Sequence, residues 1–433
     1  MKKMSYIYKL LQDNDEIKII KRGSFFNLLA SLLNAMMSAI LLFLITRVNG
    51  IAAGGMFSIA SAIAYQCYTV GEFGVRNYQS SDVKKDYSFF DYVNARIITC
   101  AFMIIMLIYL SFFQKYSLYK ALLILSFGLN KGLDAAEDVV HGEYQRNGRL
   151  DISAILLSLR YILTLLVFIL VLILSSNSVI ALSLSTIVSI IISIMLNMNI
   201  IRYFIKDKWN FDFRKIRQLL LHCLPLCISG FISIYVINAP KYGIDKILSN
   251  SDQAIFAVLF IPVVVINIMS TAVYRPYITK LSFFWKENNT KKFLNLIFLQ
   301  IGVVIVLTVV VILGGYILGL NILELIYGIE LIEYMKEFLI LLLGGGINTV
   351  SVFLSIILTI QRQQDKTFIG YIFSLVFVLL ASNVLIQNYE ILGATLLYVF
   401  TGIILVLVFT IFIWIKLKKC GGINENFNNC TGL

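Results

Sequence analysis

KGLDAAEDVVHGEYQRNGRLDISAILLSLR, residues 131–160, places a dense group of charges between two long apolar runs of the chain. At helical spacing Lys131, Asp134 and Asp138 share one face. A charge at the centre of a bilayer costs about 2.5–3.5 kcal/mol on insertion scales unless it pairs or faces water. If this stretch crosses a membrane, its charged face must therefore point into a helix bundle or a polar cavity.

The composition is that of an integral membrane protein. Of 433 residues, 59% are hydrophobic and 14% are charged, whereas ordinary globular domains carry roughly 25% charged residues. No GxxxxGK[ST] nucleotide-binding pattern occurs, so we expect no ATP hydrolysis by this chain. No pattern of cofactor or metal ligands stands out either, and we expect neither group.

Twelve apolar segments are long enough to cross a bilayer, which takes about 20 residues of helix. Gly344, Gly345 and Gly346 thin the wall of the tenth, which helps tight packing or bending. The expected spans are 24–48, 53–75, 92–113, 118–141, 151–174, 178–203, 218–240, 254–279, 293–316, 336–360, 368–387 and 392–415.

Lys and Arg gather in alternate connections, which predicts the orientation of the spans. The segment before the first span and the central connection are the most basic, so we place both termini in the cytoplasm. The net charge of +12 follows from this asymmetry and from attraction to an anionic leaflet. It gives no support to nucleic-acid binding.

The central basic connection divides the chain into two groups of six spans. We expect an N-terminal six-helix bundle with a cytoplasmic lead-in at 1–203, the connection at 204–217, a C-terminal bundle at 218–415 and a cytoplasmic tail at 416–433. A duplicated six-helix unit is a common plan for transporters. The longest outer loop is expected at about 317–335.

Helical rise puts Lys131 and Arg160 at similar depths in neighbouring antiparallel spans. We expect both to lie close to Asp134 and Asp138. One interpretation is an internal network that holds the two spans together, and the other is a cavity wall that binds an anionic head group. The two interpretations are compatible, and both stay open.

Arg275 and Arg96 lie toward the cytoplasmic ends of their spans. Arginine is well suited to bidentate phosphate binding, so both are candidates for a first anion contact. The alternative is that each is an interfacial anchor whose charged end reaches the head groups.

Two further pairs are candidates for a gate or a hinge. Glu72 and Arg76 are spaced i, i+4 beside two glycines, and Lys241 and Asp245 are spaced i, i+4 just beyond Pro240. We expect Pro240 to end or kink its helix. We expect a structural hinge at Glu72 and Arg76, whereas a gate at the outer mouth and a simple helix cap both remain open for Lys241 and Asp245.

Three motifs, in this order, resemble the polysaccharide-export flippases of bacteria (Wzx type). They are GEFGVRNYQSSD after the second span, KGLDAAEDVVHGEYQRNGRLDISAILLSLRY across the fourth and fifth, and NAPKYGID after the seventh. These flippases share a superfamily, the multidrug/oligosaccharidyl-lipid/polysaccharide exporters, with the multidrug and toxin extruders. The resemblance covers nearly the whole chain in helix count, loop lengths and motif order.

The resemblance implies two six-helix bundles around a central cavity, in a bacterial cytoplasmic membrane. It implies a substrate in which undecaprenyl pyrophosphate carries an oligosaccharide, moved from the inner to the outer leaflet by alternating access. Membrane lipids would be partners, and association with a polysaccharide polymerase and chain-length proteins stays open. Capsule and O-antigen synthesis are the processes such a flippase serves.

Two other classes of protein remain as alternatives. A small-molecule or drug antiporter would share the fold but would favour an acidic cavity suited to cations. A polysaccharide polymerase or glycosyltransferase usually carries a sizeable outer loop or soluble domain with catalytic residues. Neither feature is present, so we expect a transporter and no enzymatic activity.

Overall fold

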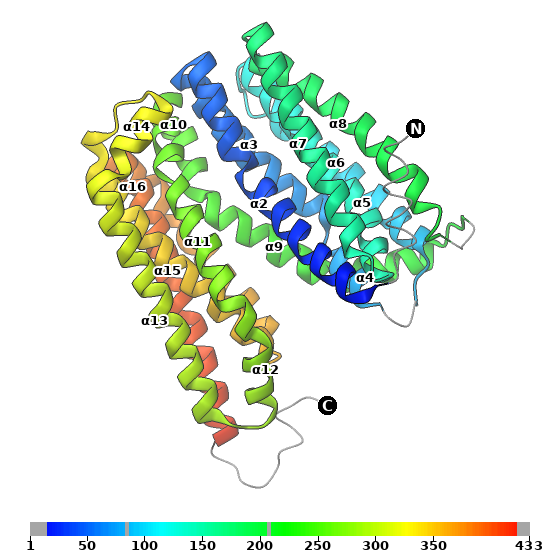
Figure 1. Cartoon of the computed structure of the whole chain (residues 1–433). Helices are drawn as coiled ribbons and strands as arrows, with labels where there is room; N and C mark the ends of the chain where they lie inside the picture. The colour runs from blue at the N-terminus through cyan, green and yellow to red at the C-terminus, as the bar shows by residue number, and fades with distance from the viewer. Residues whose placement is uncertain (1–14, 83–85, 206–208, 422–433) are drawn as a thin grey trace. The chain divides into compact units, whose positions relative to one another are not determined.

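The computed structural model describes residues 15–82, 86–205 and 209–421, and nearly all of these are helical (Figure 1). Within these ranges no strand occurs, which confirms the prediction of an all-α protein. The chain forms two compact units, unit 1 (Met1–Phe231) and unit 2 (Ile232–Leu433), divided within α9 (Phe213–Ile247). The predicted bundle limits at 204–217 stay a prediction.

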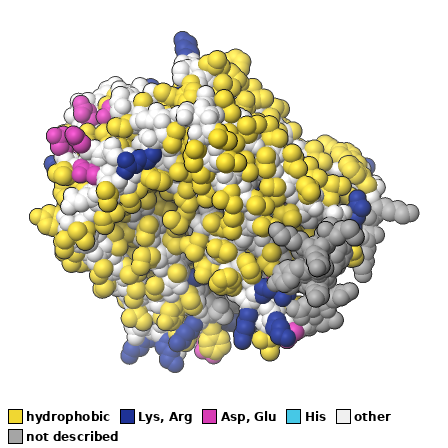
Figure 2. All heavy atoms as spheres, turned by 45° about the horizontal axis from the view of Figure 1, so that its top comes forward, with side chains coloured by type: hydrophobic (Ala, Val, Ile, Leu, Met, Phe, Trp, Pro, Cys, Tyr) yellow, Lys and Arg dark blue, Asp and Glu magenta, His cyan; other side chains and the backbone are white. Residues whose placement is uncertain are grey.

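The chain is a multi-pass membrane protein with about twelve spanning helices, as predicted. Nine helices of the described residues are long and apolar enough to cross a membrane. Beyond these, α3 (Ile51–Glu72) and α6 (Leu118–Arg146) are of spanning length, and α16 (Gln364–Gly421) contains two helices. Hydrophobic side chains cover most of the face shown in Figure 2, as contact with lipid requires.

In unit 1 the most polar helix, α6, is the central one. It packs against α3, α4, α5, α7 and α8, while α2 packs against α3 and α7 (Figure 1). The charged stretch of the sequence is therefore enclosed by apolar helices. The remaining bounds are α2 (Glu16–Asn49), α4 (Val75–Ser81), α5 (Phe89–Phe112), α7 (Leu150–Ser175) and α8 (Ser178–Ile201).

Polar side chains cap the N-termini of several helices of unit 1. Ser88 and Asp91 form a reciprocal capping box at the start of α5. Ser117 accepts a hydrogen bond from the backbone of Lys120 at the start of α6, and Asn177 caps α8 in the same way. These short polar connections fix where the apolar helices begin.

Unit 2 is organised around α15 (Met335–Ile360), which packs against α11, α13 and α16. Each glycine of its triplet faces a different neighbour: a Cβ on Gly344 would meet Tyr398 and Val399, one on Gly345 would meet Val263, and one on Gly346 would meet Thr308. The remaining bounds are α10 (Asn250–Leu259), α11 (Ile261–Tyr274), η1 (Arg275–Tyr277), α12 (Ile278–Lys286), α13 (Thr290–Gly314), η2 (Gly315–Gly319), α14 (Leu320–Tyr327) and η3 (Ile332–Tyr334).

Two local expectations need correction. Pro240 does not end its helix, because α9 continues to Ile247; the alternative, a kink at this proline, stays a prediction. A proline is tolerated in a spanning helix where neighbours compensate for the missing hydrogen bond. The segment at 317–335 is largely helical, because η2 and α14 continue the chain from the end of α13. Its apolar residues have the composition of a helix that remains in contact with lipid.

The last two expected spans, 368–387 and 392–415, form a hairpin inside α16. Glu390 has φ 50° and ψ −126°, so the helix is broken there and the chain reverses. Three residues later, a Cβ on Gly393 would lie 2.0 Å from the Leu385 carbonyl oxygen. Only glycine permits this close return of the chain.

Candidate functional site

Lys131 of α6 lies in the interior of unit 1, with 2% of its surface exposed. Its Nζ is 2.7 Å from Asp134 Oδ2 on the same helix and donates to Asn34 Oδ1 of α2 at 3.0 Å. The ammonium also lies 5.0 Å from the centre of the Tyr65 ring of α3. One lysine thus joins three helices by an ion pair, a hydrogen bond and a cation–π contact.

Arg160 of α7 also binds the carboxylate of Asp134. Its Nη2 donates to Asp134, and its Nε lies 2.7 Å from Glu137 Oε2. Its Nη1 donates to Ser189 Oγ of α8 at 3.1 Å. The predicted proximity of Lys131, Asp134 and Arg160 is therefore present, with Asp134 between the two cations.

Asp138 holds a second pair of cations one helical turn further along α6. Arg76 Nη1 of α4 donates to Asp138 Oδ1 at 2.7 Å, and Arg96 Nη2 of α5 donates to Asp138 Oδ2 at 2.9 Å. Arg96 also donates to the Gly71 carbonyl at 2.5 Å and is 2% exposed. Arg96 is thus an internal residue of unit 1; the prediction that it binds substrate remains a prediction.

The expected local pair between Glu72 and Arg76 does not form. Phe73 and Gly74 both adopt left-handed backbone angles, with φ of 50° and 69°, so α3 ends between the two residues. Arg76 then points to Asp138 instead. The break supports a hinge at this position, and that role stays a prediction.

Small polar residues on α8 complete the network, and the sequence interpretation missed them. Asn197 Nδ2 donates to Glu137 Oε1 at 3.1 Å, and His141 Nε2 lies 3.8 Å from Glu137 Oε2. Ser185, Ser189 and Ser193 precede Asn197 at spacings of four, and all are buried. That four-residue polar repeat in an apolar helix was the signal that could have revealed this face.

The charges of this network are nearly balanced. The network contains four cations and three carboxylates, and each cation lies within 3.0 Å of a carboxylate oxygen. Pairing of this kind offsets the cost of burying charge in a low-dielectric interior. The cations are Lys131, Arg160, Arg76 and Arg96, and the carboxylates are Asp134, Glu137 and Asp138.

A polar cavity of about 190 Å³ lies beside this network. Hydroxyl, amide and carboxylate groups supply both donors and acceptors along its wall. It is lined by Asn27, Ala30, Ser31, Asn34, Tyr68, Arg76, Asp134, Asp138, His141, Leu157 and Tyr161.

An ionic cluster surrounds Asp82, which follows the end of α4. Burial alone would raise the pKa of Asp82, but hydrogen bonds from the backbone amides of Asp86 and Tyr87 and from the Tyr92 hydroxyl outweigh it. Together with Arg146, which lies 3.2 Å away, they hold the pKa of Asp82 below its ordinary value. Asp82 therefore remains ionised and anchors this turn.

The candidates in unit 2 are placed differently. Arg275 is exposed in η1, between α11 and α12. Lys241 does not pair with Asp245; its Nζ lies 5.6 Å from the centre of the Phe260 ring. The expected i, i+4 pair is therefore absent, and a role for these residues in a gate stays a prediction.

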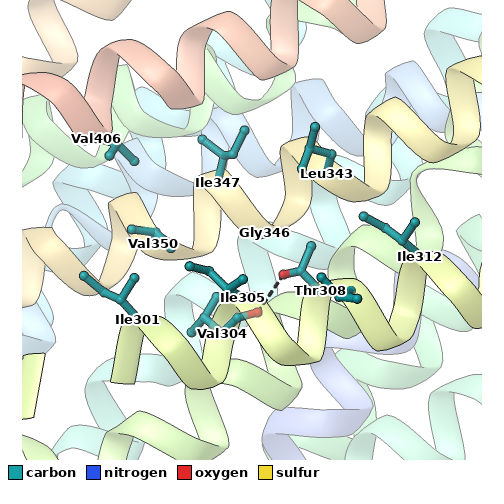
Figure 3. Close-up of a pocket in the computed structure, with 11 residues that line it drawn as sticks. Ile301, Val304, Ile305, Thr308, Ile312, Leu343, Gly346, Ile347, Val350 and Val406 are labelled. Atoms are coloured by element: carbon teal, nitrogen blue, oxygen red, sulfur yellow. Dashed lines mark hydrogen bonds between the residues drawn. The ribbon is translucent and has the colours of Figure 1, made fainter. Parts of the chain in front are cut away.

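Unit 2 also contains an apolar cavity of about 280 Å³ between α13 and α15 (Figure 3). Gly346 opens space on the α15 side, and the Thr308 hydroxyl is turned to the Val304 carbonyl of its own helix at 2.7 Å. The lining is Ile301, Val304, Ile305, Thr308, Val309, Ile312, Leu343, Gly346, Ile347, Val350 and Val406.

Known proteins similar to this chain are transporters and a polysaccharide-synthesis protein. No protein-family model matches the chain. The "Capsular polysaccharide biosynthesis protein CapF" of Staphylococcus aureus is 23% identical over 372 residues, which is 85% of this chain and 92% of that protein. The resemblance to polysaccharide-export flippases is thereby confirmed.

Solved structures show the same fold. An inward-facing multidrug resistance MATE transporter of the MOP superfamily matches with a TM-score of 0.67 and 11% identity, covering 90% of this chain and 96% of that one. A MOP superfamily transporter from Pyrococcus furiosus, described as having a binding pocket of reverse polarity, matches with a TM-score of 0.58 and 15% identity over 94% and 97%. The extruder-like fold is confirmed.

Proposed function

We propose that this membrane protein, with its extruder-like fold, moves a lipid-linked oligosaccharide across the cytoplasmic membrane for the synthesis of a surface polysaccharide. The observation that carries the proposal is the polar cavity of unit 1, whose wall offers amide, hydroxyl and paired ionic groups. Similarity to a capsular polysaccharide biosynthesis protein supports it.

The chemistry of the cavity suits sugar better than a cation. Sugar hydroxyls both donate and accept hydrogen bonds, and Asn27, Asn34, Tyr68 and Tyr161 can do the same. The carboxylates Asp134 and Asp138 are already bonded to lysine and arginine. A cationic drug would have to compete with these internal cations, so the antiporter alternative is less favoured.

The lipid part needs no polar site. An isoprenoid tail can remain in the bilayer, which is as apolar as the tail itself. Movement of the polar head between leaflets would follow alternating access, the scheme by which transporters of two repeated halves work. No bond is made or broken, so the proposed activity is transport.

The test is deletion of the gene in its host, with complementation by plasmid-borne variants. Wild type should restore surface polysaccharide and clear the accumulated lipid-linked oligosaccharide. Asn27→Trp should fill the cavity and abolish export, whereas Leu28→Trp, on an adjacent exposed position, should leave it unchanged.

Normal surface polysaccharide in the deletion strain would overturn the proposal. Export of cationic dyes that depends on the gene, with no effect on polysaccharide, would instead identify the antiporter. Membrane immunoblots of both tryptophan variants control for expression.

A further inference from the structure

Lys241 is a cation in a spanning helix that has no carboxylate partner among the described residues. It lies six residues before the end of α9 and is partly buried. Its Nζ lies over the face of Phe260, 5.6 Å from the ring centre. A lysine without a carboxylate partner keeps its N–H donors available for an anion from outside the protein.

The surroundings hold Lys241 in place. Phe260 packs edge-to-face on Tyr398, with ring centres 5.0 Å apart, so the ring under the ammonium is fixed. Two residues along α9, a Cβ on Gly243 would meet Ile386 and Ser382 of α16 at 2.2 and 2.7 Å. This close packing means that α9 cannot turn Lys241 away without separating the two helices.

The buried cations of unit 1 differ from Lys241 in their partners. There Lys131, Arg160 and Arg96 each bind a carboxylate, so their charge is already neutralised. Lys241 has no carboxylate partner among the described residues, and an aromatic face compensates an ammonium charge only in part. The structure thus leaves a point charge in unit 2 for an external anion.

We propose that Lys241 binds the phosphate group of the transported substrate, at the bond between lipid and saccharide. The inference rests on the proposed function and adds the contact for the charged link. Lysine serves phosphate as a compact point charge. An ordinary anionic phospholipid head group offers the same chemistry, so the experiment must separate the two sources.

Binding to purified protein in neutral detergent tests the proposal, by microscale thermophoresis. The probes are undecaprenyl diphosphate, uncharged undecaprenol and phosphatidylglycerol. Wild type should bind the diphosphate more tightly than undecaprenol. Lys241→Gln should weaken binding of the diphosphate about tenfold or more, which is the effect of losing one hydrogen bond to a charged group, and should leave undecaprenol binding unchanged.

Two further variants sharpen the result. Lys241→Arg keeps the charge and should retain most of the preference for the diphosphate. Lys246→Gln removes an exposed lysine from the same helix end and should behave as wild type. Because Lys241 has no ion pair to lose, Lys241→Gln should also unfold at the temperature of wild type or higher.

Unchanged diphosphate binding by Lys241→Gln would overturn the proposal, and so would a marked fall in its unfolding temperature, which would reveal a structural role. Equal binding of phosphatidylglycerol, lost in the same variant, would assign the site to ordinary lipid. Failure of the proposed function would appear elsewhere, as normal polysaccharide in the deletion strain.

Discussion

Asp134 accepts from Lys131 on its own helix and from Arg160 on α7. Removal of one partner from such a buried group leaves uncompensated charge and typically costs 3–5 kcal/mol, whereas removal of a whole pair can be nearly neutral. The network therefore fixes which faces of α6, α7 and α8 pack against one another. It also shapes the wall of the polar cavity, since Asp134 and Asp138 belong to both.

Asp134→Asn should lower the stability of the protein by about 3–5 kcal/mol, because Lys131 then loses its carboxylate partner and Arg160 keeps only Glu137. The double variant Lys131→Met with Asp134→Asn removes one charge of each sign and should recover much of that loss. Thermal unfolding in detergent measures both. Equal destabilisation by the single and double variants would contradict the charge account.

The glycine triplet of α15 allows three neighbouring helices to approach this helix closely. Its three positions face α16, α11 and α13 in turn, and a Cβ on Gly346 would lie 2.4 Å from Thr308 Oγ1. Helices that approach this closely gain van der Waals contact, which drives association in a membrane. Loss of the approach would also alter the apolar cavity, since Gly346 and Thr308 both line it (Figure 3).

Gly346→Ala should destabilise unit 2 by about 1–3 kcal/mol, the usual cost of overpacking. Gly302→Ala is the matched control on α13, because a Cβ there meets nothing within 4 Å. It should leave the unfolding temperature unchanged or raise it slightly, since alanine favours helix. Similar losses in both variants would show that packing at Gly346 is not the cause.

Over the whole chain, the distribution of Lys and Arg predicts which connections lie on the cytoplasmic side. Lysines lie in α12 and in the first turn of α13, on both sides of their connection, whereas the segment between α14 and α15 carries acidic residues. This pattern predicts that both termini lie inside.

A cysteine in place of Glu330 should react with an impermeant maleimide in intact cells, and one in place of Glu287 should react only after permeabilisation. Both glutamates are exposed, so a cysteine at either is accessible to the reagent. The parent chain for this labelling has its own six cysteines replaced. The reverse pattern would invert the topology.

The amino-acid sequence by itself determined the class of protein, the number of spans and the charged face of α6. These follow from hydropathy and helical spacing, which depend on neighbours along the chain. The proximity of Lys131, Asp134 and Arg160 was also predictable, because adjacent antiparallel helices place residues of equal depth together.

Only the tertiary structure decided the partners of Asp138 and the surroundings of Lys241. Arg76 turns to Asp138 because α3 breaks at Phe73 and Gly74, and Lys241 faces Phe260 rather than Asp245. Helical spacing brings two side chains within reach, but competition from distant residues decides whether they pair. That competition is settled by how helices pack, which depends on side chains far apart in the sequence.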